Sequence, residues 1–178
     1  MSAWLEQSVS QALLADEPIE AGDFIAAGPR WPLLDFFSEV TGDSSLAMSI
    51  LRHAVSNRIS PFSAFALAYI ESEFNPKALN ENVGSADRGL FQLNSLSYPD
   101  LPDSVVFDPE ENARVGLAHF RWCLDRARDE PAAVAMYNAG YLRVSQRKIP
   151  RSTREHVVRF VAYKRELRQK FAEAYGKA

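Results

Sequence analysis

Residues 60–76 read SPFSAFALAYIESEFNP, and this stretch predicts the central helix of the fold. Pro61 suits the first helical position, where its missing N–H costs nothing, and Ser60 before it can cap free N–H groups. Apolar side chains then recur at i, i+3, i+4 and i+7, namely at Phe62, Phe65, Ala66 and Tyr69. Pro76 disfavours helical geometry in the residue before it, so the helix should end near Phe74.

The rest of the chain also has a helical pattern, because strand alternation is weak and Gly and Pro recur at helix-length intervals. We expect further helices over 1–14, 33–39, 44–57, 110–129, 131–138 and 152–175, with a linker over 17–32. Little or no β structure is expected beyond the loop at 80–95. The predicted fold class is therefore all-α, with an N-terminal helical extension over 1–57 packed on a main domain over 58–178.

Composition indicates an ordinary globular protein of 178 residues, of which 47% are hydrophobic and 24% charged. The net charge of −3 says little about partners, but its distribution is uneven. Residues 1–45 hold eight acids and one base, whereas residues 143–170 hold ten bases and two acids. These segments are either two solvated helix faces of opposite sign or a basic flank that attracts an anionic polymer.

The sequence lacks the signals that are typical of several functional classes. The single cysteine, Cys123, lies in an apolar segment and is expected to be a buried, inert thiol. His53 and His119 have no ligand spacing around them, so neither a metal site nor a cofactor is predicted. No phosphate-binding loop or nucleophile elbow occurs, and the basic C-terminal helix lacks the interleaved aromatic residues that would indicate nucleic-acid binding.

Membrane and export signals are also missing from the pattern. No window approaches the roughly 18 apolar residues of a membrane-spanning helix, so no transmembrane segment is predicted. Residues 1–16 lack a basic start and a long apolar stretch, so they do not resemble a signal peptide.

Glu71 is the strongest candidate for a catalytic group. It follows Tyr69-Ile70 on the last turn of an apolar helix, where a carboxyl group should be partly desolvated. Desolvation favours the protonated form, and cleavage of a glycosidic bond needs a proton for the leaving oxygen. Position alone favours a surface glutamate at a helix end instead.

Five segments in order carry a family resemblance. Residues 71–78, ESEFNPKA, resemble the signature of the soluble lytic transglycosylase family, in which the first Glu is the single catalytic residue. The other four also resemble the motifs of that family: GLFQL at 89–93, DPEEN at 108–112 followed by Gly116, AMYNAG at 135–140, and the last motif around 149–154. The resemblance covers about residues 58–165 and implies a lysozyme-like helical domain that acts on peptidoglycan.

The resemblance also implies roles for individual residues. Glu71 would be the acid and then the base, Gln92 and Asn138 would hydrogen-bond the sugar, and Tyr137 would support Glu71 or stack near the cleavage site. Ser72, beside Glu71, and Asn80, at the place of a family serine, are further predicted substrate contacts. Two alternatives stay open: Gln92 could hold its loop together, and Tyr137 could be a core aromatic.

The segment 82–95, NVGSADRGLFQLNS, departs from the family pattern. It is similar to the central loop of animal-type lysozymes and to specialised transglycosylases that open the wall for secretion or conjugation machines. In the lysozymes the aspartate at the position of Asp87 is a second carboxylate. A separation of roughly 5–5.5 Å from the Glu71 carboxylate would permit a covalent intermediate and hydrolysis. Alternatively, Asp87 pairs with Arg88 or turns the loop.

The last motif is altered as well. Residues 152–157 read STREHV, so His156 stands where a family tyrosine usually lines the cleft. His156 is predicted either to hydrogen-bond the substrate or only to pack.

Three functions follow as expectations. The first is a lytic transglycosylase that cuts the β-1,4 bond between N-acetylmuramic acid and N-acetylglucosamine and forms a 1,6-anhydro product. The second is a hydrolytic muramidase that uses Glu71 and Asp87. The third is a non-catalytic peptidoglycan-binding module of an envelope machine, with residues 1–50 and the basic helix as docking surfaces.

The expected partners are peptidoglycan glycan strands and a secretion or other envelope assembly, without nucleic acid. We expect the protein in the periplasm or cell envelope. Its export would depend on a signal outside this sequence or on another route.

Overall fold

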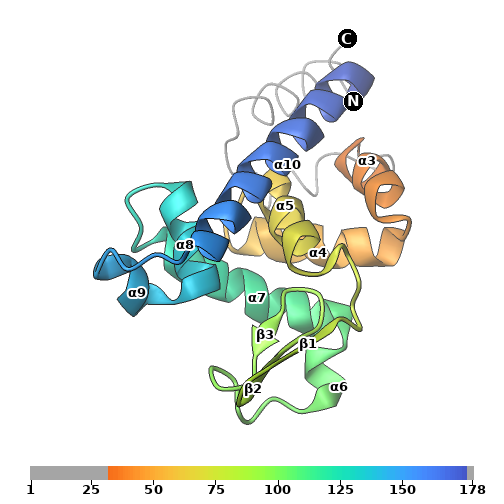
Figure 1. Ribbon diagram of the computed structural model, residues 1–178. Helices are drawn as coiled ribbons and strands as arrows, with labels where there is room; N and C mark the ends of the chain where they lie inside the picture. The colour runs from red at the N-terminus through yellow and green to blue at the C-terminus, as the bar shows by residue number, and fades with distance from the viewer. Residues whose placement is uncertain (1–31, 176–178) are drawn as a thin grey trace.

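The computed structural model describes residues 32–175. The expected helix over 1–14 and nearly all of the expected linker over 17–32 lie outside these residues. The described part consists of helices with one small three-stranded sheet, so the predicted fold class is confirmed (Figure 1).

The helices follow one another along the described chain as α3 (Pro32–Thr41), α4 (Ser44–Ser56), α5 (Pro61–Ser72), α6 (Asp103–Val106), α7 (Pro109–Leu124), α8 (Glu130–Ala139), α9 (Tyr141–Ser145) and α10 (Arg151–Tyr175). The central one is α5, which is buried on almost every side. It packs against both α4 and α10, two helices that are about a hundred residues apart in the sequence (Figure 1). A helix that is apolar all round needs such cover, because it has no polar face to turn to water.

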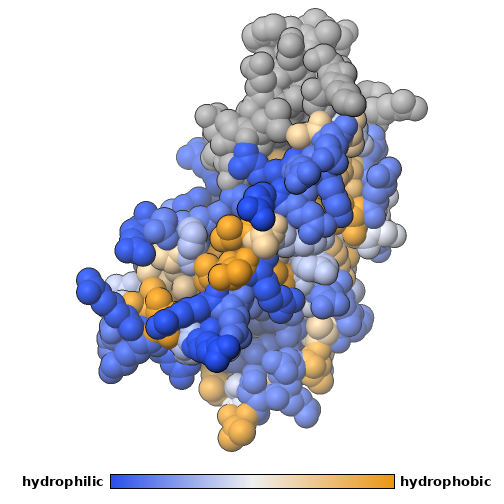
Figure 2. Space-filling model, turned by 45° about the horizontal axis from the view of Figure 1, so that its top comes forward, coloured by the Kyte–Doolittle hydropathy of each residue, from blue (hydrophilic) through white to orange (hydrophobic). Residues whose placement is uncertain are grey.

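Aromatic side chains join three helices around the N-terminal half of α5. Phe37 of α3 stacks on Phe65 of α5, with ring centroids 3.6 Å apart. Phe171 of α10 contacts both Phe36 and Phe62 edge to face, with ring centroids 5.3 and 5.6 Å apart. The core is therefore continuous from α3 to α10. Most of the molecular face shown in Figure 2 is hydrophilic.

The sheet lies in the segment where the sequence allowed β structure. Strands β1 (Leu79–Asn82), β2 (Ser85–Arg88) and β3 (Leu93–Asn94) are antiparallel and adjacent in chain order. The β1–β2 turn needs Gly84, whose φ of 80° is unfavourable for residues with a Cβ atom. The register sets Asp87 opposite Asn80 on one side and Asn94 on the other, which gathers polar side chains at the middle of the sheet.

Some predicted helix ends were wrong. The central helix begins at Pro61 as expected, but Ser60 makes no side-chain cap hydrogen bond to it. It ends at Ser72 because Glu73 and Phe74 both adopt positive φ. The next long helix ends near Leu124 rather than at residue 129, since Asp129 already caps α8 by accepting a hydrogen bond from the Ala132 N–H.

Helices α3 and α4 belong to the predicted N-terminal extension, and both contribute side chains to the same core as α5 and α10. In residues 32–175, no helix is both long enough and apolar enough to cross a membrane.

Candidate active site

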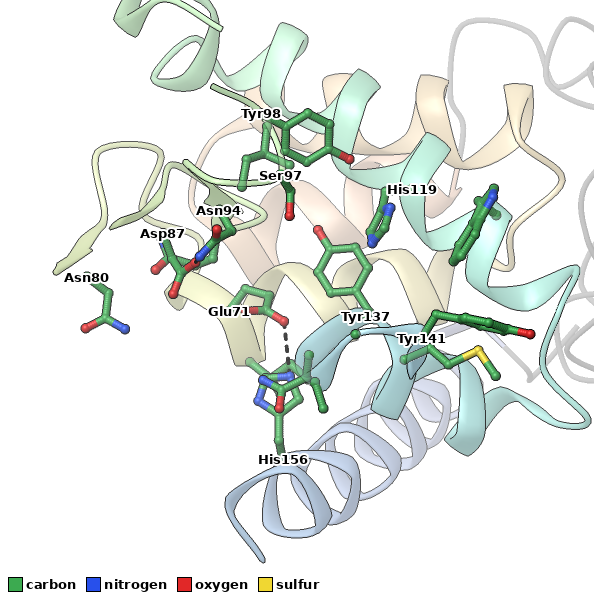
Figure 3. Close-up of a pocket in the computed structure, with 18 residues that line it drawn as sticks. Glu71, Asn80, Asp87, Asn94, Ser97, Tyr98, His119, Tyr137, Tyr141 and His156 are labelled. Atoms are coloured by element: carbon green, nitrogen blue, oxygen red, sulfur yellow. Dashed lines mark hydrogen bonds and ion pairs between the residues drawn. The ribbon is translucent and has the colours of Figure 1, made fainter. Parts of the chain in front are cut away.

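A cleft of about 570 Å³ opens between the small sheet and helices α5, α7, α8 and α10 (Figure 3). Seven of the eight predicted site residues line it: Glu71, Asn80, Asp87, Gln92, Tyr137, Asn138 and His156. Residues up to 85 positions apart in the chain thus come together around one cavity, as the family resemblance implied. Ser72 is not among the lining residues.

Glu71 reaches the cleft from the last turn of α5. Its side chain is only 10% exposed, and its Oε1 lies 3.1 Å from Nε2 of His156 on α10. Figure 3 shows Glu71 with His156 on one side and the sheet residues Asp87 and Asn94 on the other. The predicted partial desolvation of Glu71 is therefore confirmed, and His156 contacts the carboxylate directly.

Asp87 projects from β2 and is held by two asparagine side chains. Its Oδ1 accepts a hydrogen bond from Asn94 at 2.7 Å, and its Oδ2 accepts one from Asn82 at 2.8 Å. Arg88 instead donates to the carbonyl oxygens of Tyr98 and Leu101. The two amides orient the Asp87 carboxylate at the wall of the cleft.

Gln92 and Tyr137 both hold the loop over 89–92. The Gln92 amide nitrogen donates to the carbonyl of Gly89 at 2.8 Å, and the Tyr137 hydroxyl donates to the carbonyl of Phe91 at 2.8 Å. Burial, followed by the negative charge of Glu71, raises the pKa of Tyr137 well above its usual value. Tyr137 is therefore a neutral hydrogen-bond donor at any working pH.

Ser72 and Asn112 anchor the same loop from the other side. The Ser72 hydroxyl donates to the Leu90 carbonyl at 2.7 Å. Asn112, fully buried on α7, accepts from the Phe91 N–H at 2.7 Å and donates to the Val106 carbonyl at 2.7 Å. A buried amide with all these groups satisfied holds the loop in one conformation.

Two motif glycines are needed because the loop packs so closely. At Gly89, where φ is 77°, a Cβ atom would lie 2.0 Å from the Val106 carbonyl oxygen and 2.3 Å from the Asn112 amide nitrogen. At Gly116, a Cβ atom would lie 2.5 Å from that of Phe91. These contacts explain why the motifs carry glycine at both positions.

Asn138 and Asn80 differ in how firmly they are held. The Thr153 hydroxyl donates to Oδ1 of Asn138 at 2.7 Å, which leaves the Asn138 amide nitrogen as a donor at the cleft. Asn80 lies exposed on β1 at the rim. Asn138 is therefore the better oriented of the two for contact with a ligand.

Comparison with known proteins identifies the family of this chain. The family model for the transglycosylase SLT domain matches residues 48–157, which is more than half of the chain. The chain belongs to this family. Its fold is accordingly lysozyme-like, and the family is one of peptidoglycan lytic transglycosylases.

Animal lysozymes share one segment with this transglycosylase-family chain. Lysozyme C-1 and lysozyme C-2 of Sus scrofa are each 66% identical to it over 29 residues, which is 16% of this chain. The match spans 23% and 20% of the two lysozymes, so the likeness is confined to a fraction of their length. No solved structure matches the chain significantly.

An aromatic wall of the cleft has no counterpart among the residues predicted from the sequence. His119 and Trp122 of α7 stack nearly parallel, with centroids 5.8 Å apart, and Trp122 meets Tyr141 of α9 edge to face at 5.9 Å. Burial lowers the pKa of His119, which favours its neutral ring. The i, i+3 spacing of His119 and Trp122 placed them on one helix face. Only the fold shows that this face meets the cleft.

Other titratable groups lie outside the cleft. Cys123 is fully buried, so the prediction of a buried thiol is confirmed, and desolvation raises the pKa of the thiol to about 12, which disfavours the reactive thiolate. Within residues 32–175, no group of three or more His, Cys, Asp and Glu side chains is placed to hold a metal ion.

Proposed function

We propose that this chain cleaves the β-1,4 bond between N-acetylmuramic acid and N-acetylglucosamine in peptidoglycan as a lytic transglycosylase. The observation that carries this proposal is the position of Glu71. Its side chain is 10% exposed and lines the cleft of a transglycosylase SLT domain. A carboxyl group that faces the cleft is placed to act as general acid on the leaving oxygen of a bound glycan.

The first step needs a proton donor and a source of electrons. Glu71 donates its proton to the glycosidic oxygen while the bond from that oxygen to the anomeric carbon breaks. The carbonyl oxygen of the sugar's own 2-acetamido group attacks the anomeric carbon and takes up the developing positive charge. No protein nucleophile is required for this step.

The second step returns the site to its starting state. The Glu71 carboxylate removes the proton from the C6 hydroxyl of the N-acetylmuramic acid. That oxygen attacks the anomeric carbon and displaces the acetamido oxygen, which gives the 1,6-anhydro sugar. Glu71 ends protonated, and no water is consumed.

Side chains around Glu71 are suited to a sugar chain. The aromatic wall of His119, Trp122 and Tyr141 offers apolar ring surface for the C–H faces of sugar rings. The guanidinium of Arg126 packs over the Trp122 ring, with its Cζ 4.2 Å from the ring centroid. The Asn138 amide nitrogen, oriented by Thr153, offers a hydrogen-bond donor beside Glu71.

Product analysis tests the proposal. Peptidoglycan is digested with the wild type, with Glu71→Gln as the control for contaminating activity, and the fragments are weighed by mass spectrometry. We expect fragments lighter by one water than the corresponding hydrolytic muropeptides. Reducing ends throughout, or equal turnover by Glu71→Gln, would contradict the proposal.

A hydrolytic muramidase is the second candidate, and Asp87 is the observation that favours it. Its carboxylate lies at the wall of the same cleft and is oriented by Asn82 and Asn94. A second carboxylate so placed is what a retaining glycosidase needs as a nucleophile or as an electrostatic stabiliser.

Asp87→Asn separates the two mechanisms. If the enzyme is a transglycosylase, kcat should fall by no more than about tenfold, because Asp87 then only contributes charge to the cleft. A loss of roughly a thousandfold or more, together with hydrolytic products in the wild type, would establish the muramidase instead.

A non-catalytic binding module would show tight peptidoglycan binding with no turnover by the wild type. Because the substrate class is a wall polymer, we further propose that the protein acts in the periplasm or cell envelope, where a secretion or other envelope assembly would be its partner. Fractionation of cells that carry an epitope-tagged chain would test the location.

A further inference from the structure

The contact between His156 and Glu71 makes this cleft unlike one with a tyrosine at the same place. Nε2 of His156 lies 3.1 Å from Oε1 of Glu71, and both side chains are about nine-tenths buried. A tyrosine, with an ordinary pKa near 10, would stay protonated and could only donate a hydrogen bond. An imidazole, with an ordinary pKa near 6.5, can also carry the proton that a carboxyl group has lost.

We propose that His156 is a positioning residue that keeps one proton within the Glu71–His156 pair up to neutral pH and returns it to Glu71 when a glycan strand fills the cleft. This inference rests on the proposed function, because Glu71 is taken as the acid of that reaction.

The physical reason is the change of environment on substrate binding. In a water-filled cleft, the proposed resting state of the pair is a carboxylate in contact with an imidazolium. A bound glycan displaces water and lowers the local dielectric, which disfavours two separate charges relative to a neutral carboxyl group beside a neutral imidazole. One proton then moves from Nε2 to Oε1, and the pair remains neutral overall.

Proton balance is kept through the reaction. Glu71 gives this proton to the glycosidic oxygen and later takes one from the C6 hydroxyl. The pair therefore holds one proton before and after turnover. Two groups in such contact titrate together, so their proton loss belongs to the pair rather than to either residue.

Neighbouring groups do not supply an alternative proton carrier at neutral pH. Tyr137 on α8 and Tyr98 have raised pKa values and stay neutral, whereas burial lowers the pKa of His119 on α7, which stays unprotonated. The other titratable groups that line the cleft are Asp87 on β2, held by two amides, and exposed Tyr141 on α9. Helix α10 also carries the exposed Arg154, Arg159 and the Arg151–Glu155 pair.

The activity test measures kcat/KM against pH for the wild type, His156→Gln and His156→Tyr. Gln keeps a hydrogen-bond donor near the position of Nε2 without titrating, and Tyr is the residue that the family motif would have. We expect both variants to lose activity on the alkaline side at a pH lower by about one unit or more than the wild type, since a proton once lost from Glu71 has no reservoir. The same alkaline limit in all three would overturn the inference.

His53→Gln is the matched control. His53 lies 3.0 Å from Glu110 with a side chain 12% exposed, and it is outside the cleft. Its replacement should leave the pH profile of kcat/KM unchanged. A shift as large as that of His156→Gln would mean that loss of any buried histidine–glutamate pair moves the profile, and the inference would fail.

A second readout does not depend on turnover. The imidazole of His156 is titrated by NMR in the wild type and in Glu71→Gln. We expect the wild-type ring to lose its proton at a higher pH than the ring in the variant, because the carboxylate stabilises the imidazolium. Equal titration would overturn the inference even if the enzyme is active. A wild type that makes no product at any pH would instead refute the proposed function.

Discussion

Two histidine–glutamate pairs of almost the same geometry lie in this molecule. His156 meets Glu71 at 3.1 Å, and His53 meets Glu110 at 3.0 Å, with imidazoles 13% and 12% exposed. One pair faces the cleft and the other joins α4 to α7. Their surroundings explain why the same two side chains serve different purposes.

The pair at Glu110 is built to keep its charge. Glu110 lies in the first turn of α7, where free backbone N–H groups favour an anion, and Arg52 donates to it at 2.8 Å. Desolvation opposes its ionisation. The nearby Ser49 hydroxyl and the charges of His53 and Arg52 outweigh that effect and lower the pKa of Glu110. This carboxylate is a structural contact between two helices.

The pair at Glu71 has none of this support. Glu71 lies in the last turn of α5, where the carbonyl end of the helix disfavours a negative charge. In the described part of the chain, its hydrogen-bond partner is His156, and no arginine or lysine contacts it. The difference teaches that the end of the helix and the number of donors, rather than the pairing itself, distinguish the carboxyl group proposed to react from the structural one.

The largest expected effect comes from neutralising each glutamate in turn. Glu71→Gln should reduce kcat by about a thousandfold, since it removes the proposed proton donor. Glu110→Gln should change kcat by less than about twofold, because Glu110 lies outside the cleft. Turnover of peptidoglycan by both variants, at a temperature where both are folded, measures the contrast. Similar losses in the two variants would break the comparison.

Stability should show the opposite order. At pH 7, Glu110→Gln should lower the free energy of unfolding by about 1 kcal/mol, whereas Glu71→Gln should lower it by less, because within residues 32–175 only His156 contacts that carboxylate. The Glu110 pKa is lowered on folding, so its contribution is present above the unfolded-state value of 4.5 and is lost as the pH falls through the folded-state value. Urea unfolding at pH 7 and pH 3 tests this. A wild-type advantage over Glu110→Gln that persists at pH 3 would contradict the assignment.

The smallest effect is expected at Arg52. Its side chain is 57% exposed and Glu110 is 34% exposed, so solvent screens their attraction. Arg52→Ala should cost about 0.5 kcal/mol or less, and 1 M salt should remove most of the difference. A loss of 2 kcal/mol or more would mean that Arg52, rather than His53 and Ser49, dominates the Glu110 contact.

Much of the fold could be predicted because the decisive signals are local. The Pro61 start and the apolar periodicity after it identify α5, and the run of motifs orders the cleft residues along the chain. The three strands fall within a few residues of the predicted loop. The helix boundaries were less accurate, because positive φ at Glu73 and the cap at Asp129 reflect competing local contacts rather than hydrophobic period.

The site was predicted less completely. Glu71 was predicted from its helix and its motif. Ser72 and Gln92 were predicted to contact the substrate. In the structure, the Ser72 hydroxyl donates to the Leu90 carbonyl, and the Gln92 amide nitrogen donates to loop carbonyls. Trp122 gave no signal, since an aromatic residue on an apolar helix face is usually a core residue. Its place at the cleft depends on how α7 packs beside α9 in the fold.

The amino-acid sequence by itself determined the helix that carries Glu71, the place of the central loop along the chain and the family to which the chain belongs, since each depends on short-range periodicity or on residues within one motif. The tertiary structure alone decided that His156, 85 residues further on, meets Glu71, and that Asp87 is oriented by two asparagines. Such contacts arise from how helices and strands pack, and burial changes what each side chain does with its proton. The chemistry of the cleft therefore depends on distances between elements that no local pattern encodes.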